Sequence, residues 1–202
     1  MDIDPKEMVE AAAAVNERRE TDLARLNAAV AVMVALLATF MGICKVKDDN
    51  IVQAMQQAQA DRLDHWSYYQ ARNVRQDVAE ATVVQLELAK LSAAPAAVPG
   101  YDAAITRYRE SVRDQAQKRA VLKEQAEADQ KTYDALNYRD DQFDLCDALL
   151  AIAISMLAVT ALTRSWALFW AAMVPTAFGV LMGMAGLAGL PIHPGALIRL
   201  LS

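Results

Sequence analysis

One interruption, residues 93–100, most constrains how this chain can fold. It contains Pro95, Pro99 and Gly100, whereas the polar segment of roughly 45 residues on each side of it contains neither proline nor glycine. Proline removes a backbone donor and clashes with the preceding helical turn, and glycine tolerates positive φ, so helices end at such a site. We therefore expect the chain to fold back here, which brings together residues whose numbers add up to about 193.

The composition indicates helices rather than strands. The 202 residues are 55% hydrophobic and 22% charged, and the two classes lie in separate segments without strand-like alternation. The expected fold is all-α: an integral membrane protein with three transmembrane helices and a long antiparallel coiled-coil hairpin between the first and the second. A net charge of −5 argues against a nucleic-acid partner, which needs a clustered basic face.

Three apolar runs are long enough to cross about 30 Å of hydrocarbon. The expected segments are an N-terminal amphipathic arm at 1–25, transmembrane helices at 26–44, 145–163 and 165–190, an extramembrane hairpin at 45–144 with its turn at 93–100, and an interfacial tail at 191–202. The arm either lies as a short helix at the membrane surface or binds a partner.

The two arms of the hairpin, each about 70 Å long at 1.5 Å per residue, differ in regularity. In the return arm, alternate steps of three and four from Ile105 to Phe143 reach 12 positions, of which eight are apolar. This spacing predicts a coiled-coil seam, and its polar positions indicate a modest interface or a further partner. The outgoing arm has a discontinuous stripe, formed by Ile51, Met55, Ala58, Trp66, Tyr69, Val78, Ala81, Val84, Leu88 and Leu91.

Small residues recur at helical spacing in all three apolar runs. They are Ala35, Ala38 and Gly42 in the first, Ala151, Ser155 and Ala158 in the second, and Gly179 and Gly183 in the third. Small residues let helices in lipid approach closely, and the fold-back pairs the first set with the second in depth, so we expect the first two spans to pack there. The alternative is that alanine is simply frequent in this chain.

Aromatic residues concentrate at His65, Trp66, Tyr68 and Tyr69. The fold-back places Trp66 opposite Ala126, and a large residue against a small one is ordinary packing between helices. Exposed Trp and Tyr side chains also serve as binding anchors, so a partner-docking patch is the second interpretation.

Six aspartates lie where the hairpin meets the membrane face: Asp48, Asp49, Asp140, Asp141, Asp144 and Asp147. They form either a solvated acidic belt balanced by Lys45, Lys47 and Arg139, or a site that attracts a divalent cation, the one cofactor that we consider. Cys44 and Cys146 fall at similar depth, as a disulfide or as two buried thiols.

The distribution of basic residues predicts the orientation. The N-terminal arm and the short loop at Arg164 both carry positive charge and lie on one side in a three-span topology. We expect this side to be cytoplasmic, with the hairpin in the periplasm of a bacterial inner membrane. Lys45 and Lys47 at the root of the hairpin oppose this orientation.

Three motifs carry a resemblance to a known family. They are Trp-x-Tyr-Tyr-Gln-Ala-Arg at 66–72, Phe-Asp-Leu-x-Asp-Ala-Leu-Leu at 143–150 and Leu-Thr-Arg at 162–164. Together with the order of span, hairpin and two spans, they resemble a bacterial membrane family known as Domain of Unknown Function 4337. The resemblance implies a prokaryotic integral membrane protein and carries no known activity.

No sequence feature indicates an enzyme: the chain has two histidines, no nucleophile turn and no phosphate-binding glycine loop. The first hypothesis is a non-enzymatic, homo-oligomeric membrane scaffold or stalk, whose hairpin mediates self-association or docks a protein partner. The second is a cation-conducting or cation-gated oligomeric pore with the aspartates at its mouth. An accessory subunit of a larger membrane complex is a third possibility.

Overall fold

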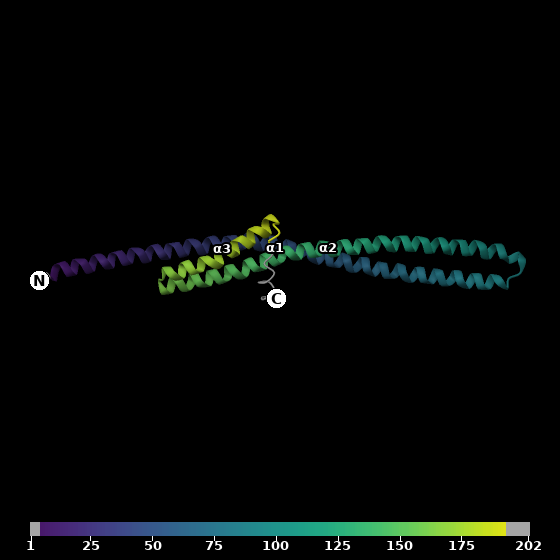
Figure 1. Ribbon diagram of the computed structural model, residues 1–202, viewed down its shortest axis with the longest axis horizontal. Coiled ribbons are helices and arrows are strands. Elements are labelled where there is room, and N and C mark those ends of the chain that lie inside the picture. Colours follow the sequence, from purple (N-terminus) through teal and green to yellow (C-terminus); the bar gives the residue numbers. More distant parts are fainter. Residues whose placement is uncertain (1–4, 193–202) are drawn as a thin grey trace. The chain divides into compact units, whose positions relative to one another are not determined.

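The computed structural model describes residues 5–192, apart from the side chains of residues 5, 7–9, 11 and 12. It consists of α1 (Pro5–Leu91), the short 3-10 helix η1 (Pro95–Ala97), α2 (Val98–Thr163) and α3 (Trp166–Ala188) (Figure 1). Within residues 5–192 there is no strand, so the all-helical prediction is confirmed. In the described part of the chain, three helices are long and apolar enough to cross a membrane.

Helix α1 runs without a break through three segments that hydropathy distinguishes. Residues 5–25 of the predicted arm, the apolar run 26–44 and the first arm of the hairpin all belong to it. An arm that turned onto the membrane surface would need a break near residue 25, and the helix has none there. Residues 1–4 of the arm and 193–202 of the predicted tail lie outside the described residues.

The interruption at 93–100 ends one helix and starts the next, as expected. Helix α1 stops at Leu91, and α2 begins at Val98, so Pro99 lies in the first turn of α2. The first-turn amides of a helix have no partner within the helix, which is why proline fits there without cost. The return helix therefore starts at Val98, within the last residues of the expected turn at 93–100.

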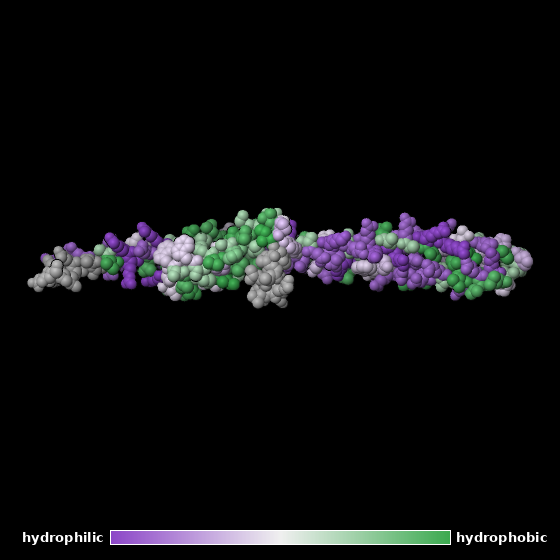
Figure 2. All heavy atoms as spheres, in the orientation of Figure 1, coloured by the Kyte–Doolittle hydropathy of each residue, from purple (hydrophilic) through white to green (hydrophobic). Residues whose placement is uncertain are grey.

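The contacts within the chain separate it into two compact units. Unit 1 contains Met1–Ile51 and Tyr138–Ser202, and unit 2 contains Val52–Asn137. Figure 2 shows mostly polar residues over the visible face of unit 2, with apolar residues gathered towards its turn, and mostly apolar residues over α2 and α3 in unit 1.

In unit 2, α1 and α2 lie side by side and antiparallel (Figure 1). Side-chain hydrogen bonds or ion pairs join Arg62 to Gln130, His65 to Asp129, Arg72 to Gln115, Asn73 to Arg119, Glu87 to Arg109 and Lys90 to Asp102. The residue numbers of these pairs add up to between 187 and 196, close to the expected 193. Polar side chains thus hold much of this helix pair in register.

The apolar stripe predicted on α1 in unit 2 only partly faces α2. Val78, Ala81, Val84 and Leu88 are exposed, whereas Ala79 is buried. The half-buried or buried positions 72, 76, 79, 83, 86 and 90 follow steps of four and three, and they form the α1 side of the contact with α2. Of the predicted stripe, Met55, Ala58, Trp66 and Tyr69 are buried or half-buried, and the part from Val78 to Leu88 is the exposed part.

In unit 1, large side chains pack over glycines. A Cβ added to Gly179 would lie 2.8 Å from Leu150, and one added to Gly183 would lie 2.7 Å from Phe40. On the same face of α3, a Cβ added to Gly186 would lie 2.9 Å from Phe143. These glycines let α3 approach side chains of both α1 and α2, as expected for a close-packing helix face.

The expected contact between the small residues of the first two spans is absent from unit 1, among the described residues. Ala35, Ala38, Gly42, Ala151, Ser155 and Ala158 are all exposed, and a Cβ at Gly42 would meet nothing within 4 Å. The buried positions are instead Leu26, Val30, Leu37 and Cys44 on α1 and Cys146, Leu150, Ala153 and Leu157 on α2. Larger side chains bury more area per contact, which explains why they face inwards in a single chain.

Two polar side chains of α2 hold the C-terminal end of α3. Arg139 Nη2 donates a hydrogen bond to the carbonyl of Gly186 at 2.9 Å, and Gln142 Nε2 donates to those of Leu190 and Ile192 at 2.9 and 2.7 Å. Gly189 ends the helix in the left-handed conformation, with φ of 68°. The last carbonyls of α3, which lack partners within the helix, are thereby partly satisfied.

Candidate functional site

The six predicted aspartates all lie in unit 1, and two of them form ion pairs with Lys45. Lys45 Nζ lies 2.7 Å from Asp48 Oδ2 and 3.5 Å from Asp49 Oδ1, and the hydrogen bond with Asp48 helps to raise the pKa of Lys45 to about 12. Asp48 is only 3% exposed, and its Oδ1 accepts no hydrogen bond from the described residues. A buried carboxylate oxygen without a donor is unfavourable, and the contact of the other oxygen with Lys45 offsets part of this cost.

This environment raises the pKa values of two aspartates of α2. Burial first, then a hydrogen bond with Asp48 and the charges of Asp144, Asp48 and Asp141, raise the pKa of Asp140 from 3.8 to about 6. Burial and the charge of Asp48 also raise the pKa of Asp144 above its usual value. The protonated Asp140 carboxyl can donate a hydrogen bond to Asp48, so the pair is suited to hold a proton between α1 and α2.

The aspartates do not form a chelating group. Among the described residues, no cluster of three or more His, Cys, Asp or Glu side chains has a geometry that would hold a metal ion. Asp147, inside the second apolar run, has a buried Oδ1 that accepts no hydrogen bond from the described residues. The divalent cation that we considered at these aspartates therefore finds no coordinating arrangement in the described part of the chain.

Cys44 and Cys146 meet between α1 and α2. Both are buried free thiols, and a hydrogen bond joins them. The side chain of Cys146 also contacts α3, because a Cβ at Gly183 would lie 2.8 Å from its Sγ. The structure thus brings the two cysteines together as free thiols, without a disulfide between them.

Three of the four aromatic-cluster residues are engaged within unit 2. His65 Nδ1 lies 2.7 Å from Asp129 Oδ2, Trp66 and Tyr69 stack edge to face with centroids 5.2 Å apart, and Arg119 lies over the Tyr69 ring. All three are half-buried, whereas Tyr68 is 61% exposed. Tyr68 is thus the member of this cluster that remains most available to a partner.

A second apolar face of α1 in unit 2 is exposed, and we call it the outward stripe. It consists of Ala71, Val74, Val78, Ala81 and Leu88, at spacings of three, four, three and seven. Val74 and Val78 are each 60% exposed and Leu88 is 62% exposed. The spacing is that of a coiled-coil seam, so one further long helix would fit along this stripe.

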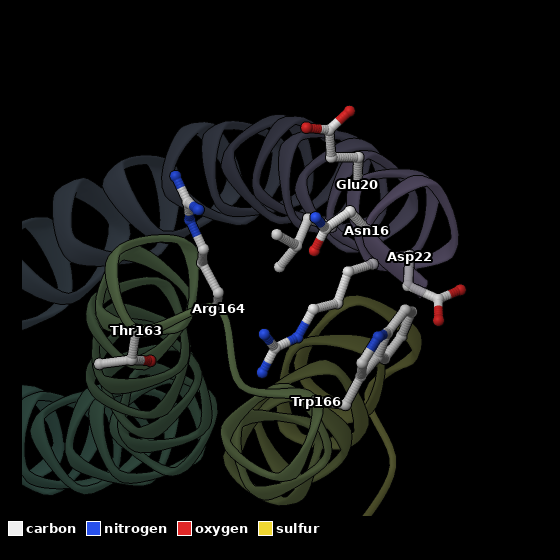
Figure 3. A pocket seen from close by; sticks show the side chains of 8 residues that line it. Asn16, Glu20, Asp22, Thr163, Arg164 and Trp166 are labelled. Carbon is white, nitrogen blue, oxygen red and sulfur yellow. The ribbon is translucent and has the colours of Figure 1, made fainter. Parts of the chain in front are cut away.

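A pocket in unit 1 was not anticipated as a site. It lies between α1 and the turn that joins α2 to α3, and its lining includes Asn16 and Arg19 from α1, Arg164 from the turn and Trp166 from the start of α3 (Figure 3). The basic residues of the N-terminal arm and Arg164 were used only to predict orientation. The available signal was that Arg19 and Arg164 flank matching ends of the first and second apolar runs, which a three-span topology would place at the same membrane face.

The chain matches the model of one protein family, described as "Domain of unknown function (DUF4337)", over residues 26–189. No curated protein and no solved structure matches it. The matched region includes the three apolar runs and everything between them, which is most of the 202 residues. The chain therefore belongs to the DUF4337 family of domains of unknown function.

Proposed function

We propose that this chain is a non-enzymatic integral membrane protein that assembles with further copies of itself through unit 2. In this proposal the apolar runs of α1, α2 and α3 cross the membrane, and the helix pair of unit 2 lies outside it as a coiled-coil stalk. The observation that carries the proposal is the outward stripe, because a solvated helix gains nothing from exposed valine and leucine at heptad spacing.

A second copy of the chain is the occupant that fits the stripe best. Copies anchored in one membrane share a direction, so their α1 helices run parallel when they meet. Around a twofold axis, each stripe residue then meets its own counterpart, as in a parallel coiled coil. Beside the stripe, Gln70 of one copy would meet Arg75 of the other, so no like charges are opposed there.

The test compares two glutamate variants at exposed valines. Val78→Glu places a charge in the stripe, and Val121→Glu makes the same change on α2 at a site 50% exposed and outside the stripe. We expect native mass spectrometry in detergent to show a parent dimer or larger oligomer, which V78E weakens by about tenfold or more because the charge must be desolvated. V121E should leave the mass unchanged.

A disulfide crosslink tests whether the two α1 helices run parallel and in register. In a parallel pair, a Val78→Cys variant should form a disulfide between two copies under mild oxidation, because residue 78 meets residue 78. A monomeric parent, or an equal effect of V78E and V121E, would refute the proposed interface.

The orientation is part of the same proposal. Basic residues of α1 before the first apolar run, and Arg164 after the second, favour a cytoplasmic location for this end and a periplasmic one for unit 2 in a bacterial inner membrane. A reporter fused at Gly100 tests it: a cytoplasmic signal would reverse the orientation. Extraction at alkaline pH tests membrane insertion separately.

The cation-conducting pore is the second candidate, and one observation favours it. Asp144 is exposed beside the partly buried Asp140 and the buried Asp48, so an oligomer would bring several such groups around an axis. Cation flux into liposomes should then fall in Asp144→Asn and Asp147→Asn variants. Absence of flux with the parent protein would discard the pore.

A further inference from the structure

The pocket between α1 and the turn from α2 to α3 has the size of a small-ligand site. Its volume is about 620 Å³. Arg164 belongs to the turn, Trp166 begins α3, and Asn16 and Arg19 come from α1. Figure 3 shows Asn16 and the ring of Trp166 beside the space between the three helices.

Within the described side chains, the arginines in this pocket have no acidic partner. Among residues whose side chains the structure describes, neither Arg19 nor Arg164 forms an ion pair or a side-chain hydrogen bond. Two carboxylates also belong to the lining, but those of Glu20 and Asp22 point away from the space in Figure 3. Asp22 moreover lies 4.0 Å from Arg25. The charge that faces the pocket is therefore positive.

The start of α3 adds hydrogen-bond donors. Ser165 precedes the helix and makes no side-chain cap, so the first-turn amides of α3 keep donors that the helix itself does not use. Helix N-termini attract anions, and paired guanidinium groups bind phosphate oxygens in a fixed geometry. The combination of two unpaired arginines and an uncapped helix start suits a phosphate group.

The place of the pocket along the helices indicates where such a phosphate comes from. Arg19 precedes the first apolar run by about two turns, Arg164 lies between the second and the third, and Trp166 begins α3. If the three runs cross a bilayer, as proposed above, all three residues lie at the same headgroup layer, which tryptophan also favours. The phosphate nearest to this pocket is that of a lipid.

We propose that this pocket binds the phosphate of an anionic phospholipid, with Arg19 and Arg164 contacting its oxygens. The proposal rests on the membrane insertion proposed above, but not on the outward stripe or on oligomer formation. It assigns the pocket to one lipid molecule held by the protein, beyond the general attraction of a basic segment for an acidic membrane.

The experiment measures lipid retained by the full-length protein. The protein is reconstituted in nanodiscs of phosphatidylcholine with a minor fraction of phosphatidylglycerol, released in detergent and examined by native mass spectrometry. The variants are Arg19→Gln, Arg164→Gln and the double variant. Arg18→Gln is the matched control, because it removes the same charge from the neighbouring position of α1 and does not line the pocket. A parallel series adds millimolar glycerol phosphate as a soluble competitor.

We expect the parent to retain one phosphatidylglycerol in preference to phosphatidylcholine, and the double variant to lose this preference by about tenfold, the effect of one to two charge-assisted contacts. R18Q should behave as the parent. Equal loss in R18Q, or no preference in the parent, overturns the proposal while alkaline extraction still reports insertion. Displacement of the retained phosphatidylglycerol by glycerol phosphate would assign the site to free phosphate esters and overturn the proposal that a lipid binds there.

Discussion

The raised pKa of Asp140 predicts how the stability of unit 1 depends on pH. Because its folded-state pKa of about 6 exceeds the ordinary value of 3.8, the folded chain binds this proton more tightly than the unfolded chain. The stabilisation is therefore fully present below about pH 3.8 and is lost as pH rises through about 6. Replacing Asp140 with asparagine removes this dependence and keeps a donor for Asp48.

The size of the effect follows from the pKa values. A shift from 3.8 to about 6 corresponds to ~3 kcal/mol at ~1.4 kcal/mol per pKa unit. Asp140 is partly exposed, so solvent screening reduces the expected effect to ~1–2 kcal/mol. We expect Asp140→Asn to raise the free energy of unfolding by this amount at pH 8 and to change it little at pH 4.

Unfolding in mixed micelles by added dodecyl sulfate measures this difference. In a Trp66→Phe background, the remaining tryptophan fluorescence comes from Trp166 and Trp170 in unit 1. Asp64→Asn, at an exposed site in unit 2, makes the same change in charge and should show no such pH dependence. If D140N destabilises the protein at pH 8, or if D64N reproduces its pH profile, the account of buried carboxylates around Asp48 is wrong.

Three further predictions concern the packing of unit 1. Gly183→Ala should lower the free energy of unfolding by ~1–3 kcal/mol in the same micelle assay, because its Cβ would lie 2.7 Å from an aromatic ring. Gly42→Ala, the control, should leave the free energy of unfolding unchanged or raise it by up to ~1 kcal/mol. Similar losses in both variants would contradict the observed packing. Gln142→Leu should speed amide hydrogen exchange in the segment that follows α3, because two carbonyls there lose their donor; unchanged exchange would show that this contact does not hold the segment. Mild oxidation of membranes with diamide should join Cys44 to Cys146 within one chain, seen as loss of both alkylation sites by mass spectrometry; two alkylated thiols after oxidation would place them apart.

Strong local signals made much of the helical structure predictable. The prolines and glycine at 93–100 end a helix whatever surrounds them, and the helix pair of unit 2 follows from that turn. The second apolar run ends at Thr163, where the sequence placed its end. The continuity of α1 across residues 25 and 44 was not foreseen, because a change in hydropathy does not by itself break a helix.

Which of two alternative faces of a helix turns inwards could not be predicted from the sequence. On α1 in unit 2, the apolar residues Val78 and Leu88 lie on one face and Val83 and Leu86 on another, and the contacts with α2 decide which face turns inwards. The arginine pocket has the same character: Arg19 and Arg164 are 145 positions apart, and each by itself is an ordinary residue next to an apolar run. Tertiary contacts, which periodicity does not contain, decide both.

The packing of unit 1 explains why the expected pairing of small residues is not observed. Two small faces pressed together would bring backbones close but would bury few side-chain atoms. A glycine face opposite large side chains achieves both, because Gly183 and Gly186 receive the rings of Phe40 and Phe143. The small residues of the first two spans, including Gly42, are left on the outside, where close approach remains open to lipid or to another helix. If copies of this chain meet within the membrane as well as through the outward stripe, this face is where their backbones can come closest.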